Sequence, residues 1–159
     1  MSGLLTKKQR RRFSNENLQI IKNKSDYCKA YQDTDNPYIW YFLIKGQPDT
    51  MIEGGEYIGK IVRCDGYYEN SFVQKIFMLT PNGKYDFNFN IDLCRDGINP
   101  TVYWVMQLLY DLDCSFLSFI NLDENSRKIK FDLIKKLAVE SISYNKENLS
   151  DIYSKFNLE

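Results

Sequence analysis

Apolar residues recur at helical spacing near both ends of the chain and gather into short runs between them. Residues 4–22 mix apolar positions with lysine, arginine and glutamine, which predicts an amphipathic first helix. Four runs rich in aromatic and β-branched residues then predict β-strands at residues 27–31, 38–45, 55–63 and 72–79. Because the connections between these runs are short, we expect an antiparallel meander of four strands. The apolar positions expected on one face of the first helix are Leu4, Leu5, Phe13, Leu18 and Ile21.

The second half of the chain predicts helices. Residues 86–97 alternate phenylalanine and asparagine without a clean period, so we expect them to be mostly irregular. Asn99 and Pro100 then suit the cap and first position of a central helix that continues to about residue 119.

Two more helices complete the predicted order. The first carries Ile129, Leu133, Ile134 and Leu137 on one face, and the second covers residues 149–156. Segregated strands and helices of this kind predict an α+β domain spanning residues 1–159, without internal repeats or linkers.

Composition excludes several classes of protein. The 159 residues suffice for one domain with its own core, and 21 basic residues balance 21 acidic ones. This balance provides no overall field for nucleic acid, and a nucleic-acid binder would have only the basic run at residues 7–12 to use. No apolar stretch reaches bilayer length and no signal peptide opens the chain.

The cysteine and histidine content restricts the chemistry further. The cysteines are scattered without a Cys-x-x-Cys pair, so we expect no zinc site, no other cofactor and no disulfide framework in a reducing compartment. With no histidine, the chain cannot use a Ser-His-Asp or Cys-His triad. The four cysteines are Cys28, Cys64, Cys94 and Cys114.

One turn and one cysteine are candidates for chemistry. Residues 80–83, Thr-Pro-Asn-Gly, form a strong turn signal after the fourth strand, and Cys94 follows before the central helix. A thiol beside a fixed amide donor suits acyl transfer, in which charge develops on a carbonyl oxygen. The alternatives are a packed cysteine at residue 94 and a purely structural turn at Asn82.

The motifs and their order resemble the ubiquitin-conjugating (UBC) family. The turn at residues 80–83 is similar to the branch in which Thr-Pro-Asn-Gly replaces His-Pro-Asn, a branch of often tail-anchored enzymes that serve ER-associated degradation. The other matching stretches are residues 40–42, 45–50, 53–60 and 137–145.

The resemblance implies specific roles. Cys94 matches the cysteine that accepts ubiquitin or a ubiquitin-like modifier as a thioester, and Asn82 matches the asparagine that orders the active-site loop and supports the oxyanion. The implied partners are the modifier, its activating enzyme and a ubiquitin ligase, in the cytosol or on the cytosolic face of the ER if a membrane tail lies beyond Glu159. The residues that match partner-binding surfaces are Lys7, Lys8, Arg11, Tyr67 and Tyr68.

Two departures leave a second interpretation open. The Pro-x-x-Pro-Pro element of the family is absent at residues 70–74, and only residues 95–98 separate Cys94 from the next helix cap. These changes suit a catalytically weak or inactive variant that binds ubiquitin or a conjugating enzyme. The basic run at residues 7–12 is either a solvated face or a docking surface for an acidic partner.

Overall fold

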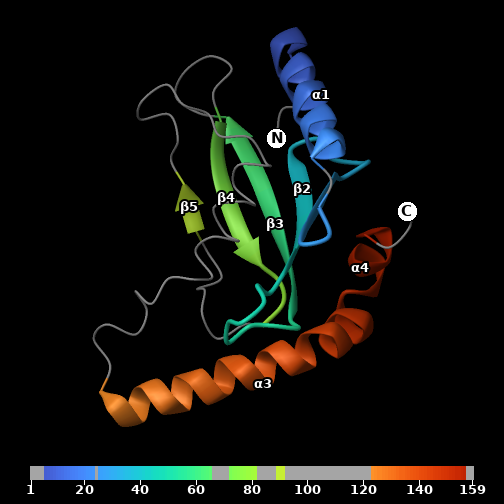
Figure 1. The fold of residues 1–159 in the computed structure, drawn as a ribbon. Helices are drawn as coiled ribbons and strands as arrows, with labels where there is room; N and C mark the ends of the chain where they lie inside the picture. Colours follow the sequence, from blue (N-terminus) through green and yellow to red (C-terminus); the bar gives the residue numbers. More distant parts are fainter. Residues whose placement is uncertain (1–5, 24, 66–71, 82–88, 92–122, 157–159) are drawn as a thin grey trace.

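The computed structural model describes residues 6–23, 25–65, 72–81, 89–91 and 123–156 of the chain. The described strands form one antiparallel sheet in the order β1-β2-β3-β4-β5 (Figure 1). The elements are α1 (Lys7–Lys22), β1 (Cys28–Gln32), β2 (Ile39–Lys45), β3 (Glu56–Asp65), β4 (Phe72–Met78), β5 (Phe89–Ile91), α3 (Glu124–Asn148) and α4 (Ser150–Phe156).

The predicted four-strand meander is confirmed, with one correction to the segment that follows it. Residues 89–91 were expected to be irregular, yet they form β5 and pair with β4 from Gln74 to Ile76. Three residues are too few to show a period in the sequence, and unpaired backbone groups along the edge of β4 provide the reason to pair. The predicted central helix after Pro100 lies outside the described residues.

Helices cover both faces of the sheet. Alternate residues of β2 point to opposite faces, so Trp40 and Phe42 join a core with Phe13 of α1 and Ile134 of α3. On the other face, Leu43 packs in a second cluster with residues of α4. The members of this second cluster are Leu43, Ile58, Tyr153 and Phe156, with Tyr31, Tyr41, Leu79, Leu149 and Ile152 partly buried against them.

Tyr31 and Tyr41, which are partly buried against the second cluster, have raised pKa values. The Tyr31 hydroxyl donates to the carbonyl oxygen of Ile152 at 3.4 Å, which joins β1 to α4. Loss of hydration on burial raises the pKa of Tyr31, with smaller contributions from Tyr41 and Asp33. Burial also raises the pKa of Tyr41, so both phenols stay neutral at physiological pH.

The buried faces of α1 and α3 differ from the predicted ones. In α1, Phe13 is buried as expected, but Leu18 and Ile21 are 53% and 60% exposed. In α3, Ile134 is buried while Ile129 and Leu133 are exposed. Each helix instead turns toward the core a face with the spacing i, i+4, i+7, i+11, on which Ile20 is partly buried. The polar residues of these faces are hydrogen-bonded: Gln9 accepts from the Thr6 amide at the start of its own helix, and Glu16, Ser141 and Asn145 bond to the sheet. These faces are Gln9, Phe13, Glu16 and Ile20 in α1, and Ile134, Ala138, Ser141 and Asn145 in α3.

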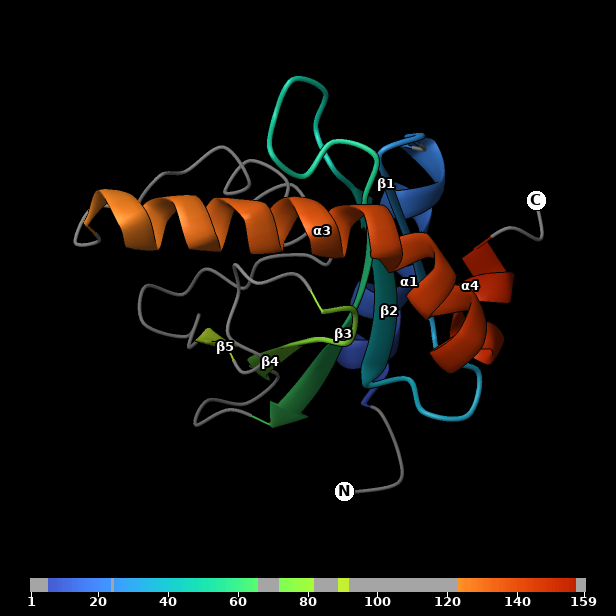
Figure 2. The same ribbon diagram turned by 90° about the horizontal axis from the view of Figure 1, so that it is seen from below.

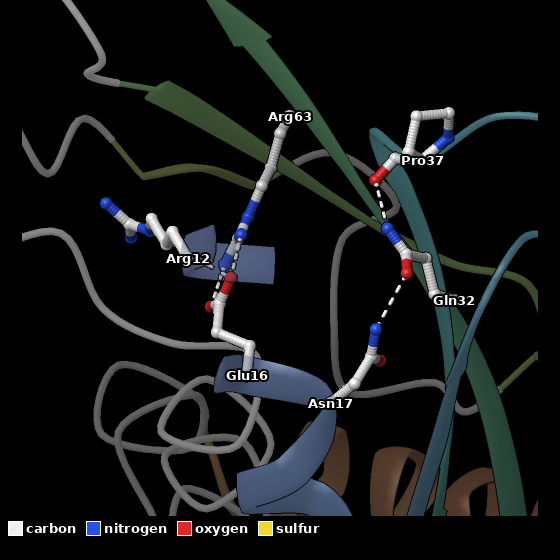
Figure 3. A network of polar contacts seen from close by, with 6 residues as sticks. All are labelled: Arg12, Glu16, Asn17, Gln32, Pro37 and Arg63. Carbon is white, nitrogen blue, oxygen red and sulfur yellow. Dashed lines mark hydrogen bonds and ion pairs between the residues drawn. The ribbon is translucent and has the colours of Figure 1, made fainter. Parts of the chain in front are cut away.

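A buried ion pair fixes α1 against the sheet. Arg63 of β3 donates to both carboxylate oxygens of Glu16 (Figure 3), and both side chains are buried. The guanidinium also lies 4.6 Å from the ring centre of Trp40 and 5.3 Å from that of Phe13. Arg12 approaches the same carboxylate at 3.9 Å from the exposed side of the helix.

Candidate functional site

The first residue of the candidate turn, Thr80, is held by β3. Thr80 is fully buried just beyond the end of β4, and its hydroxyl accepts a hydrogen bond from the Ile58 amide at 2.9 Å. The amides of Leu79 and Thr80 both donate to the Ile58 carbonyl oxygen, at 2.8 and 3.2 Å. The backbone that enters Pro81 therefore has a fixed position relative to the sheet.

Helix α3 contacts the same residue from outside the sheet. The Thr80 hydroxyl donates to Oδ1 of Asn145 at 2.6 Å, and Nδ2 of Asn145 donates to the Glu56 carbonyl oxygen at 2.9 Å. Asn145 is fully buried. Figure 1 and Figure 2 show why this is geometrically feasible: α3 crosses the end of the sheet where β3 begins and β4 ends.

A second side chain of α3, Ser141, binds the start of β3 and its own helix. Ser141 accepts a hydrogen bond from the Glu56 amide at 2.9 Å and donates to the Ala138 carbonyl oxygen at 2.7 Å. The Glu56 carboxylate accepts a hydrogen bond from the Tyr153 hydroxyl of α4 and lies 4.0 Å from Lys45 Nζ. Glu56 thus connects the first strand position of β3 to both C-terminal helices.

The predicted site residues fall into two groups. Asn82, Cys94, Tyr67 and Tyr68 lie outside the described residues. Lys7, Lys8 and Arg11 are exposed on α1, and the last two help to line an open hollow along that helix.

Helix α1, which carries the exposed basic residues, and Thr80 contact opposite ends of β3. Helix α1 is fixed by Arg63 near the end of β3, whereas Thr80 contacts Ile58 near its beginning. Figure 1 shows α1 beside one end of the sheet and β4 ending toward the other.

The described part of the chain provides neither a metal site nor a membrane span. No group of three His, Cys, Asp or Glu side chains within it is placed to hold a metal ion. Among the same residues, no helix is both long and apolar enough to cross a bilayer.

The polar contacts of α3 with Thr80 and Glu56 were not predicted from the sequence. Ser141 and Asn145 are four residues apart and continue the helical spacing set by Ile134 and Ala138. The signal in the sequence was polar residues at the same helical spacing as the apolar ones. Such residues are expected to be buried and hydrogen-bonded to another element, because a buried polar group needs a partner.

Comparison with known proteins identifies the family. No family model matches the chain. It is 31% identical over 116 residues to ubiquitin-conjugating enzyme E2 6 of Eremothecium gossypii, covering 73% of this chain and 47% of that protein. It is 29% identical over 148 residues to the E2 6 protein of Saccharomyces cerevisiae, covering 89% of this chain and 57% of that one. The chain thus spans about half the length of these curated relatives.

Two further comparisons extend the relation. Human ubiquitin-conjugating enzyme E2 J1 is 31% identical over 83 residues, covering 52% of this chain and 26% of that protein. A crystal structure from Plasmodium yoelii, described as a ubiquitin conjugating enzyme, superimposes with a TM-score of 0.65 at 17% identity, covering 87% of this chain and 97% of that one. This structural likeness confirms the predicted UBC-like α+β fold. The chain belongs to the ubiquitin-conjugating (UBC) family, with relatives among its E2 6 and E2 J1 members.

Proposed function

We propose that this protein is a ubiquitin-conjugating enzyme. It accepts ubiquitin or a ubiquitin-like modifier from an activating enzyme as a thioester on Cys94 and passes it to a substrate lysine, usually with a ligase. The observation that carries the proposal is the similarity to the E2 6 proteins over most of the chain. The buried anchoring of Thr80, directly before the Pro-Asn-Gly turn, supports it.

The proposed chemistry suits a chain without histidine. The Cys94 thiolate attacks the thioester carbonyl of the modifier, a new carbon–sulfur bond forms, and the activating enzyme's cysteine leaves as a thiolate. A lysine amine then attacks the Cys94 thioester, loses a proton to water, and Cys94 leaves as a thiolate. The Asn82 amide stabilises the oxyanion of this second step. Positioning the amine supplies much of the rate advantage, so no imidazole base is required.

The exposed basic face of α1 provides a docking surface in this proposal. Lys7, Lys8 and Arg11 are exposed, so they are available to steer an acidic surface of the activating enzyme. We assign Tyr67 and Tyr68 to contacts with the ligase or activating enzyme. The reaction takes place in the cytosol or on the cytosolic face of the ER.

A binding module of the same fold is the second candidate. The short segment at residues 95–98 and the absent Pro-x-x-Pro-Pro element at residues 70–74 favour it. Such a variant would hold ubiquitin or a conjugating enzyme without forming a covalent bond.

Thioester loading separates the two candidates. The chain is incubated with ubiquitin, its activating enzyme and ATP, and the products are resolved on gels with and without thiol. The enzyme predicts a ubiquitin-sized adduct that thiol removes. Non-covalent binding of ubiquitin with no adduct supports the binding module instead.

A further inference from the structure

The hydroxyl of Thr80 connects two elements that are far apart in the sequence. It accepts the Ile58 amide of β3 at 2.9 Å and donates to Asn145 of α3 at 2.6 Å. Thr80 and Asn145 are both fully buried, so water does not compete for these bonds. The side chain therefore has one favoured orientation as long as both partners are present.

We propose that Asn145 is a positioning residue for the active-site turn, acting through its hydrogen bond to Thr80. The inference rests on the proposed function, because the turn matters only if it carries the amide that serves the transfer step. Asn145 itself touches no reacting atom. It sets the orientation of the chain segment that leads to Asn82.

The short covalent path from Thr80 to Asn82 makes this transmission direct. The ring of Pro81 fixes its own φ, and it restricts the backbone of Thr80 to extended conformations. Few free torsions then remain between a held Thr80 and the Asn82 backbone. An amide that must meet an oxyanion tolerates little displacement, since a 1 Å error can reduce a rate by about 10²-fold.

Ser141 provides a matched control within the same helix. Both Ser141 and Asn145 are buried on one face of α3, and each satisfies one backbone group of Glu56. Asn145 also binds Thr80, whereas the partners of Ser141 are Glu56 and Ala138. Truncation of either residue removes a bond from the start of β3, but the Asn145 variant also releases Thr80.

The first experiment compares loading with discharge in Asn145→Ala and Ser141→Ala. Loading of Cys94 by the activating enzyme should stay within about twofold of wild type in both variants, because each loses two side-chain hydrogen bonds and keeps the rest of the fold. Single-turnover discharge to lysine should slow about five- to tenfold in Asn145→Ala. This is the change expected when a displaced Asn82 loses one hydrogen bond to the oxyanion, which is made only in the transfer step. Ser141→Ala should discharge at the wild-type rate even if its melting temperature falls equally.

Variants of Thr80 test whether the effect passes through this contact. Thr80→Val keeps the side-chain shape but removes the hydroxyl, so it should slow discharge as Asn145→Ala does. The discharge rate of the double variant Thr80→Val/Asn145→Ala should fall by less than the product of the two single effects, because both variants remove the shared Thr80–Asn145 bond. Thr80→Ser retains the hydroxyl and should discharge near the wild-type rate.

A measurement that needs no catalysis keeps the inference separate from the proposed function. The NMR amide shifts of Asn82 and Gly83 should change in Asn145→Ala and stay unchanged in Ser141→Ala. Unchanged shifts in Asn145→Ala, or equal slowing of loading and discharge, overturn the positioning role. If the wild-type chain forms no thioester, the proposed function fails and the transfer role fails with it, while the amide shifts still decide whether Asn145 fixes the turn.

Discussion

Replacement of Glu16 by glutamine removes one charge from the buried ion pair that joins α1 to β3. The side chain of Arg63 is fully buried and that of Glu16 is only 3% exposed. In Glu16→Gln the amide keeps the shape of the side chain, but the guanidinium loses its opposite charge inside the fold. We therefore expect this variant to be far less stable than the wild-type protein.

The magnitude follows from the burial of the pair. Leaving one member of a buried ion pair uncompensated typically costs about 3–5 kcal/mol. The contacts of Arg63 with Trp40 and Phe13 remain in the variant, so they do not offset the loss. Against a total free energy of unfolding of about 5–15 kcal/mol, this cost is a large fraction. A fall in melting temperature on the order of 10 °C should accompany it.

Urea denaturation of matched variants checks this value. Arg12 is the third member of the cluster, 3.9 Å from the carboxylate and partly exposed, so Arg12→Ala should cost less than about 1 kcal/mol. The double variant Glu16→Leu/Arg63→Met replaces both buried charges by apolar groups and should be more stable than Glu16→Gln. If the slope of the unfolding free energy against urea concentration is the same in all variants, they expose equal surface on unfolding and their stabilities can be compared directly.

One result refutes the reasoning about this pair. If Glu16→Gln loses no more stability than Arg12→Ala, the carboxylate does not balance a buried charge. Among the described contacts, helix α1 would then be held mainly by the packing of Phe13 and Ile20 and by the hydrogen bond from Asn17 to Gln32.

Two further predictions concern the proposed reaction. Asn82→Ala should load Cys94 normally but discharge slowly to lysine, since loss of an oxyanion donor costs about 3 kcal/mol in the step that uses it; equal slowing of both steps with a lower melting temperature indicates a structural turn residue instead. The double variant Lys8→Glu/Arg11→Glu should load more slowly at low salt with an unchanged melting temperature, because both residues are exposed on α1. The control Lys128→Glu/Lys136→Glu makes the same charge change on exposed positions of α3, and equal rates in the two double variants contradict a docking role for α1.

The sequence predicted the order of the described elements because their patterns are local. The run at residues 38–45 alternates large apolar residues over two faces, and β2 indeed buries Trp40 and Leu43 in opposite clusters. The Thr-Pro-Asn-Gly turn is likewise predicted from four consecutive residues, of which Asn82 and Gly83 lie outside the described residues. Strand β5 was not predicted, because its pairing with β4 is a backbone interaction that leaves no side-chain period in the sequence.

The buried faces of the helices could not be predicted from hydrophobicity alone. Glu16 is buried because Arg63 lies opposite it, and Asn145 is buried because Thr80 lies opposite it. These partners are 47 and 65 residues away along the chain. A prediction based on polarity alone assigns such side chains to solvent. The face predicted to be buried is therefore rotated about the helix axis relative to the observed one. Exposed Leu18 and Ile129 are the corresponding errors.

Loading of Cys94 is the measurement that tests the proposed enzyme most directly. Wild type, Cys94→Ser and Cys94→Ala are each incubated with ubiquitin, its activating enzyme and ATP. We expect a thiol-sensitive adduct from wild type, a thiol-resistant ester from Cys94→Ser, and no adduct from Cys94→Ala, because only the first two retain a nucleophile at this position. A thiol-sensitive adduct that persists in Cys94→Ala would contradict the assignment of Cys94, and no adduct from the wild-type chain would contradict the enzyme itself.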